Sequence, residues 1–130
     1  MREHVQLQEL VEDHELDQEE DMIRAIVKRP DEAVGHVTNI SNRLEKMQGH
    51  VEGYIETVTV KFPDIEEDGV VIICNEDGRL QGLPHNCRVR LPGGAEVDFV
   101  GTILIVGCND EEFTDLPEWV TRKEWSTWLV

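Results

Sequence analysis

Short runs of hydrophobic and alternating residues along this chain predict a β-sheet. Residues 70–74 (Val-Val-Ile-Ile-Cys) are continuously apolar, too few for a helix and rich in β-branched side chains, which predicts a buried strand. Residues 54–62 alternate like a half-buried strand, and the acidic loop 63–68 is expected to join the two as an antiparallel pair. Residues 99–106 are apolar at both parities, which predicts a central strand.

The part of the chain before this strand pair predicts a hairpin followed by a helix. Residues 22–28 and 35–40 have the pattern of its two strands. Ser41 is expected to cap the helix, which Gly49 or Gly53 then ends. The positions expected to face the sheet follow at helical spacing, and they are Leu44, Met47, Gln48 and Val51.

A tight turn is expected at residues 75–78 (Asn-Glu-Asp-Gly), where the buried strand ends. The Asp-Gly pair favours a positive φ, so residues 79–83 are expected to return as a short partner strand or an extended segment. Pro84 ends this segment because proline cannot donate to a strand ladder. Residues 85–97 carry Asn, Pro and Gly-Gly, which predicts a loop with a short hairpin.

The pattern changes in residues 110–130. Asp115, two residues before Pro117, predicts the start of a helix. All three tryptophans of the chain are in this segment, at Trp119, Trp125 and Trp128. A closing helix docked on the open sheet face is the favoured interpretation, and a partner-binding helix is the alternative.

These elements predict an α+β domain: a mostly antiparallel sheet of about five strands, covered by one internal helix and a C-terminal helix. With 130 residues the chain fits one domain. We expect an acidic arm or short amphipathic helix at 1–21, a core at 22–109 and a Trp-rich docked helix at 110–130. The glutamate codons just before Met22 are rich in purines, as a bacterial ribosome-binding site is. Met22 is therefore a candidate alternative start.

Charge limits the classes of partner. The 28 acidic and 12 basic residues give a net charge of -16, to which residues 1–21 contribute half through nine acidic residues and one arginine. This charge disfavours direct binding of nucleic acid and favours basic partners. No apolar run approaches the roughly 18 residues that cross a bilayer, and the first residues are acidic where a signal peptide is basic. With three scattered cysteines, a cytoplasmic location is expected.

Four separated motifs then occur in order. They are Gly-Tyr-Ile-Glu at 53–56, Ile-Cys-Asn-Glu-Asp-Gly-Arg-Leu at 73–80, Gly-Leu-Pro with Asn86, and Gly-Thr to Ile-Val-Gly at 101–107. This order resembles small bacterial and phage proteins of the DUF3846 family, a domain of unknown function. The resemblance covers residues 22 to about 107 and leaves out the first residues and the tail after Thr114. The resemblance implies that the protein is encoded on phages, plasmids or conjugative elements, often near anti-restriction genes. No activity comes with the family name.

Polar residues around the central turn form the candidate ligand site. Strand pairing is expected to bring Tyr54 and Glu56 near Asn75, and polar groups converging beside a rigid hairpin are typical of small-ligand pockets. Turn chemistry is the competing interpretation, in which Asn75 bonds its own turn and Asn86 caps the loop after it. The candidate residues are Tyr54, Glu56, Asn75, Glu76, Arg79 and Asn86.

No catalytic or metal-binding set emerges from the sequence. The soft ligands Cys74, His85, Cys87 and Cys108 lack a Cys-x-x-Cys pair, so neither zinc nor another cofactor is expected. Residues 50–52 and 84–87 are only partly similar to a zinc-deaminase signature, because its paired cysteines are missing. The chain's two serines lack a glycine elbow, and its carboxylates are too abundant to single out a pair.

The expected function is therefore a non-enzymatic accessory protein of a phage or mobile element that acts by binding. In one mechanism, an acidic interaction or anti-defence protein occupies a basic, nucleic-acid-binding site on a host protein. In the other, a small-ligand protein binds a nucleotide signal, which requires Arg79, Arg88 and Arg90 to cluster against the overall negative charge. No membrane partner is expected. An enzyme is a third class of function, and the sequence leaves open whether the protein forms a homo-oligomer.

Overall fold

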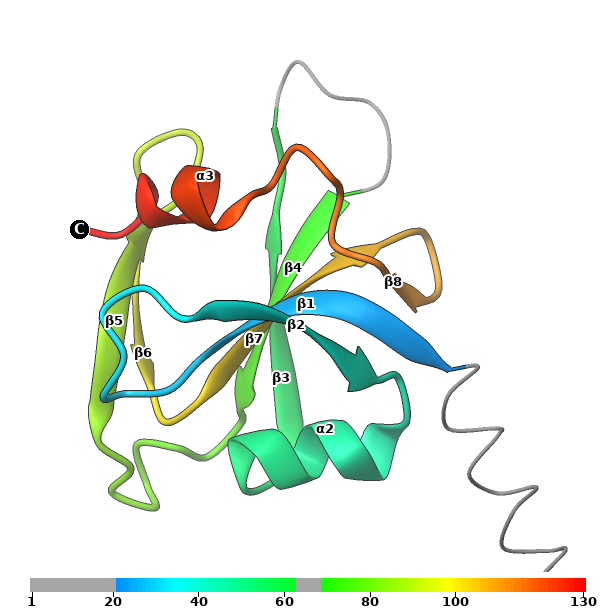
Figure 1. Cartoon of the computed structure of the whole chain (residues 1–130). Coiled ribbons are helices and arrows are strands. Elements are labelled where there is room, and N and C mark those ends of the chain that lie inside the picture. Colours follow the sequence, from blue (N-terminus) through cyan, green and yellow to red (C-terminus); the bar gives the residue numbers. More distant parts are fainter. Residues whose placement is uncertain (1–20, 63–68) are drawn as a thin grey trace, which may run out of the picture.

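The computed structural model of the chain describes residues 21–62 and 69–130. Over these residues it has one six-stranded sheet and a separate two-stranded hairpin, and all strand pairs are antiparallel (Figure 1). The main sheet has the order β2–β1–β7–β4–β3, and β8 pairs with β7. Its strands are β1 (Met22–Lys28), β2 (His36–Ser41), β3 (Ile55–Val60), β4 (Gly69–Asn75), β7 (Ile103–Cys108) and β8 (Phe113–Thr114). The α+β class and the mostly antiparallel sheet are confirmed.

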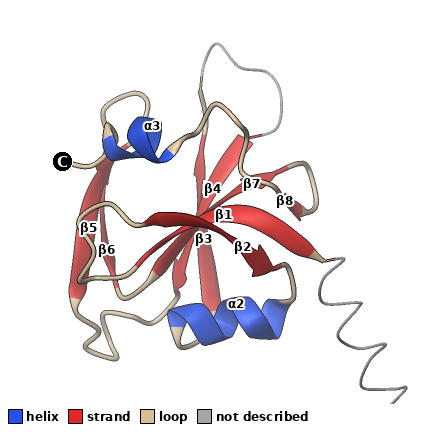
Figure 2. Ribbon diagram, viewed as in Figure 1, coloured by secondary structure: helices blue, strands red, loops and turns tan. Residues whose placement is uncertain are grey.

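The remaining elements are a hairpin and two short helices (Figure 2). The hairpin consists of β5 (His85–Arg90) and β6 (Glu96–Val100), and the helices are α2 (Leu44–Val51) and α3 (Arg122–Ser126). None of the helices in the described part is long and apolar enough to cross a membrane. Residues 1–20 of the predicted arm and the predicted loop at 63–68 lie outside the described residues.

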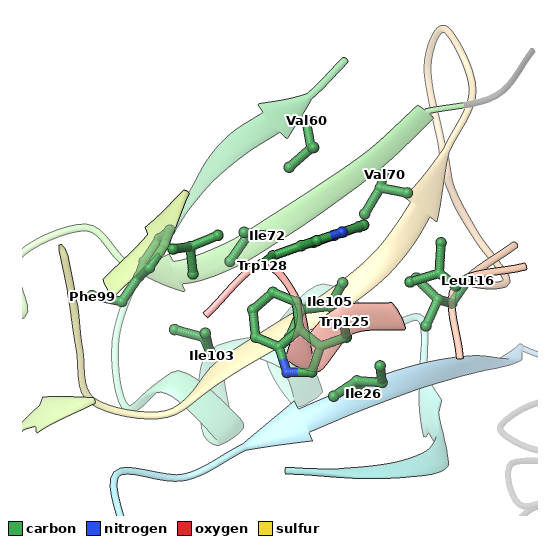
Figure 3. Close-up of a cluster of buried hydrophobic side chains, with 12 residues drawn as sticks. Ile26, Val60, Val70, Ile72, Phe99, Ile103, Ile105, Leu116, Trp125 and Trp128 are labelled. Atoms are coloured by element: carbon green, nitrogen blue, oxygen red, sulfur yellow. The ribbon is translucent and has the colours of Figure 1, made fainter. Parts of the chain in front are cut away.

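Alternation along β1, β4 and β7 divides the core into two layers, one on each face of the sheet. The first layer lies under the β5–β6 hairpin and the C-terminal segment (Figure 3). Its buried side chains include Ile26, Val70, Ile72, Phe99, Ile103, Ile105, Leu116, Val120, Trp125 and Trp128. The second layer lies under α2, and it includes Ala25, Val27, Met47, Val51, Val71, Ile73, Leu104 and Val106. Because successive side chains of a strand point to opposite faces, the same three strands supply side chains to both layers.

The helix α2 is present where the sequence predicts it, but its ends and its apolar face differ. Arg43 occupies the N-cap position, and the Ser41 hydroxyl accepts only the Arg43 backbone N–H, at 3.3 Å. The helix ends at Val51, and the C-cap residue after it, Glu52, has a φ of 66° although it is not glycine. Met47 and Val51 are buried as predicted, whereas Leu44, the first residue of the helix, is 55% exposed.

The predicted strand at 99–106 is broken in two. Gly101, with a φ of 72°, separates β6 from β7, so the apolar run supplies one strand to the hairpin and one to the sheet. The second part, β7, is central as predicted. The short hairpin expected within 85–97 is present and longer, because β6 extends to Val100.

The segment after β4 forms turns and no partner strand. Gln81 N–H donates to Asp77 O at 2.9 Å and Leu83 N–H donates to Gly78 O at 3.0 Å, so residues 76–82 coil locally. Gly78 does not have a positive φ; Gly82 does, at 73°. The expected return strand is therefore wrong, because hydrogen bonds within the turn replace those of a ladder.

The C-terminal segment docks on the sheet as predicted, but its helix is short and begins later. Asp115 starts no helix; its carboxylate accepts the Arg24 backbone N–H at 2.7 Å. The helix begins after Thr121, whose hydroxyl accepts the Glu124 N–H at 3.0 Å as an N-cap. Trp125 is fully buried, and its indole N–H donates to Val34 O at 2.8 Å.

Candidate functional site

A pocket of about 260 Å³ opens between β3, the end of β4, the turn after it and β6. Its apolar lining comes from β3, β4 and β6, namely Val58, Cys74, Val97, Phe99 and Val100. All of these except Val100 pack in the first core layer. Its polar lining comes from Glu56, Asn75, Glu76, Asp77, Arg79 and Asp98. Leu80, which is 88% exposed, extends the apolar surface along the turn. The pocket therefore combines an apolar base with a mainly acidic rim.

Four of the predicted ligand residues line this pocket: Glu56, Asn75, Glu76 and Arg79. Tyr54 and Asn86 do not. Tyr54 lies just before β3 and is 69% exposed, and its carbonyl accepts the Glu76 N–H at 2.8 Å. Asn86 is buried at the start of β5, between the hairpin and the main sheet.

Asn75 is held by its local backbone. Its side-chain amide donates to Val51 O at 2.9 Å and to Gln81 Oε1 at 3.2 Å, and its carbonyl oxygen accepts the Asp77 N–H at 2.7 Å. The last bond is an Asx turn. Gly53 packs so closely on Asn75 that a Cβ there would meet the amide nitrogen at 2.6 Å. Asn75 thus joins the end of α2 to the turn and leaves little of its side chain for a ligand.

Asn86 forms a buried reciprocal pair with Lys28. The Lys28 ammonium donates to Asn86 Oδ1 at 2.6 Å and to Glu32 O at 2.7 Å. In return the Asn86 amide donates to Lys28 O at 2.8 Å and to Gly101 O at 2.7 Å. Lys28 is only 2% exposed. Asn86 therefore ties β1, β5 and the β6–β7 junction together, and a buried charge depends on it.

The three arginines that a nucleotide site requires lie along the hairpin, but each is already engaged. Arg79 donates to Asp98 O at 2.9 Å. Arg88 forms an ion pair with the Asp98 carboxylate at 2.9 Å, and Arg90 pairs with Glu96 at 2.9 Å. The hydrogen bond from Arg88 is the largest cause of a lowered pKa of Asp98. The arginines therefore cluster, but carboxylates offset the charges of Arg88 and Arg90, and only the charge of Arg79, which bonds a backbone carbonyl, is left.

Three carboxylates on the pocket rim lack such partners. Within residues 21–62 and 69–130, Glu56, Glu76 and Asp77 have no basic group at ion-pair distance. Asp98 is paired with Arg88, and Arg79 contributes one positive charge to the lining. The rim is therefore net negative and attracts a cation more strongly than a phosphate.

The thiols on and near this pocket are protonated at neutral pH. Burial raises the pKa of Cys74 from 9.0 to about 11, and the nearby Glu56 carboxylate adds to the shift. Burial likewise raises the pKa of Cys87 to about 11. Among the described residues, no three His, Cys, Asp or Glu side chains are arranged to hold a metal ion.

We expect iodoacetamide at pH 8 to alkylate Cys74 and Cys87 about 100-fold more slowly than in the urea-unfolded chain, because a pKa raised by two leaves about a hundredth of the thiolate. Peptide mass spectrometry after timed quenching measures each site. The same shifts predict that stability falls as the pH rises from 9 to 11, since the folded chain then holds more protons. Equal alkylation rates in the folded and unfolded chain would contradict the buried thiols.

Sequence reasoning missed Lys28 and Asp98 as residues that organise this region. Lys28 ends an apolar strand, and no local pattern shows that its ammonium is buried. Asp98 was detectable in principle, because it pairs across the hairpin with Arg88 while Glu96 pairs with Arg90.

Comparison with known proteins identifies a family and no activity. No curated protein and no solved structure matches the chain. A family model described as a domain of unknown function (DUF3846) matches residues 23–128. The match extends past residue 107 through the tryptophan-rich segment, in keeping with the place of Trp125 and Trp128 in the core. The chain therefore belongs to the DUF3846 family.

Proposed function

We propose that this protein is a non-enzymatic binding protein whose negative charge directs it to a basic surface on a partner protein. The observation that carries the proposal is the net charge of -16 in a chain of 130 residues. Such a charge steers association with cationic surfaces and repels nucleic acid.

The charge is concentrated in two segments. Residues 1–20 hold eight acidic residues and one basic, and residues 63–68 hold four acidic residues and no basic. The rest of the chain holds sixteen acidic and eleven basic residues, a net charge of only -5. The two segments thus supply more than two thirds of the net charge and are the first targets for mutagenesis.

Within this class we propose an accessory protein of a phage or mobile element that covers the nucleic-acid-binding site of a host defence protein. Such sites are basic because they bind phosphates, so an acidic protein is complementary to them. The resemblance to proteins of mobile elements supports the same function.

A small-ligand protein is the second candidate, and the pocket lined by Glu56, Glu76 and Arg79 is what favours it. The acidic rim opposes a nucleotide signal, because Arg79, Arg88 and Arg90 are already engaged by Asp98 and Glu96. An anionic ligand would have to displace these contacts, so we rank this function below protein binding.

The proposal predicts salt-sensitive capture of basic proteins. The immobilised full chain is expected to retain nucleic-acid-binding proteins from a bacterial lysate at low salt and to lose them as the ionic strength rises and the Debye length falls from about 30 Å to 8 Å. Duplex DNA is expected to compete for the same proteins. Quantitative mass spectrometry of stepwise salt eluates measures both effects.

The matched variant replaces Asp64, Glu66, Glu67 and Asp68 by Asn or Gln, which removes four charges while keeping side-chain size. It is expected to release the same proteins at lower salt. The control replaces Asp110, Glu111 and Glu112 in the same way and leaves residues 63–68 intact. Capture that is equal at all salt concentrations, or that DNA does not reduce, would contradict the proposal.

A further inference from the structure

The edges of the two sheets differ in how they are covered. Leu129 bridges to Val89 at the outer edge of β5, where the Arg90 N–H donates to Trp128 O at 2.8 Å and the Val130 N–H donates to Arg88 O at 2.9 Å. On β6, Arg79 donates to the carbonyl of Asp98. The main sheet ends in β2 and β3, and no described strand pairs with the outer edge of either. Among residues 21–62 and 69–130, the outer edges of β2 and β3 are therefore open to a further strand.

The register of β3 shows which of its backbone groups face outward. The Glu76 N–H donates to Tyr54 O, and these residues stand opposite each other in the antiparallel register. Because hydrogen-bonded and non-bonded pairs alternate, Glu56 bonds to β4 whereas the backbone groups of Thr57 and Thr59 point away from it. Both threonine side chains are exposed, so a strand can approach this edge.

This open edge borders the acidic pocket. Glu56 and Val58 of β3 line the pocket, while the neighbouring Thr57 and Thr59 offer the free backbone groups. An added strand lies about 4.8 Å from β3, and every second side chain of it lies on the pocket face of the sheet. A single segment can therefore pair with the edge and fill the pocket.

The charge of the rim selects the occupant. Glu56, Glu76 and Asp77 lack basic partners within the described ranges, and the pocket base is apolar. A Lys or Arg side chain matches both features, because its methylene stem packs on apolar atoms while its charged end meets carboxylates. We propose that an extended segment of the basic partner protein adds to β3 as an extra strand and inserts a Lys or Arg side chain into this pocket.

This inference rests on the proposed function for the basic character of the partner, and it adds the binding mode, strand addition. A second copy of the chain is a poorer occupant, because its β3 strand carries a carboxylate, Glu56, and no Lys or Arg that would match the acidic rim.

The test begins with a randomised library of short peptides selected on the full chain. Enriched peptides are expected to contain a Lys or Arg flanked by β-branched residues. Thr57→Pro removes a backbone N–H that points outward, and it breaks no hydrogen bond between β3 and β4. It is expected to weaken the binding of these peptides at least tenfold. Glu56→Lys, which reverses a charge on the pocket rim, is expected to weaken peptide binding by a similar factor. Fluorescence anisotropy measures the affinities.

Asn39→Pro on β2 is the matched control. The Asn42 N–H donates to Asp21 O at 2.9 Å, so by the same alternation the backbone groups of Asn39 point out from that edge. This variant is expected to bind the peptides like the parent chain. Circular dichroism melting of both proline variants identifies any loss of folding, and Glu56→Lys tests the pocket without altering the edge.

Amide exchange completes the test. In the peptide complex, the N–H groups of Thr57 and Thr59 are expected to become protected, which a merely electrostatic contact does not produce. Absence of enriched peptides, peptides without a basic residue, or equal binding to Thr57→Pro and Asn39→Pro would overturn the inference. A concentration-dependent dimer that Thr57→Pro abolishes would also overturn it, because a second copy would then occupy the edge.

The outcome can be separated from that of the proposed function. If Thr57→Pro keeps the salt-sensitive, DNA-competed capture of basic proteins, the proposed function stands and strand addition fails. If the parent chain shows no such capture, the proposed function fails whatever the peptides show.

Discussion

Replacement of Asn86 by leucine is expected to lower the free energy of unfolding by about 3 kcal/mol, because a buried charge loses an acceptor and two buried carbonyls lose a donor. The Lys28 ammonium keeps only Glu32 O as a partner, and the carbonyls of Lys28 and Gly101 are left without the amide. Urea unfolding followed by tryptophan fluorescence measures the change.

A double-mutant cycle isolates the charge in this effect. Lys28→Met with Asn86→Leu removes the ammonium together with its acceptor, so the double variant is expected to be more stable than Asn86→Leu alone. Asn42→Ala is the control, because it removes one part-buried bond to Phe113 O and is expected to cost about 1 kcal/mol. If Asn86→Leu were no more harmful than Asn42→Ala, the Lys28–Asn86 pair would not join the two sheets.

Trp125→Ala is expected to lower the free energy of unfolding by about 3–5 kcal/mol, the usual cost of emptying a large core position. Trp125 is fully buried in the layer between the sheet and the C-terminal segment, and its ring meets Trp128 edge-on with centroids 5.7 Å apart (Figure 3). Chemical denaturation followed by circular dichroism measures the loss.

Two further variants separate packing from hydrogen bonding and from exposure. Trp125→Phe keeps an aromatic ring but loses the bond to Val34 O, and it is expected to cost less than Trp125→Ala. Trp119→Ala is the exposed control, since Trp119 is 40% exposed and meets the Phe62 ring edge-on. Equal losses for Trp119→Ala and Trp125→Ala would show that the tail is not part of the core.

The strands could be predicted because each carries its own signal. β4 is found where a short apolar run predicts it and β7 lies within such a run, because continuous apolar residues are typical of a strand buried on both faces. β1 is found where the sequence predicts the first strand of a hairpin. The error at 99–106 has a local cause: the run contains Gly101, and hydropathy does not show that this glycine has a positive φ.

The candidate site was predictable in part. Glu56, Glu76 and Arg79 were found because strand pairing and the turn after β4 place them together. The amides Asn75 and Asn86 carry no signal that separates a ligand contact from a structural one. Their partners, Val51 O and Lys28, come from distant elements, so only the folded chain reveals that they hold the structure.

The sequence by itself determined the class of fold, the central place of β7, the membership of the family and the negative charge, because each depends on composition or on patterns within a few residues. The tertiary structure alone decided that the sheet has two core layers and that Lys28 is buried against Asn86. It also decided that β3 ends the sheet beside an acidic pocket. These features depend on contacts between segments far apart in the chain, and no local periodicity encodes which segments meet.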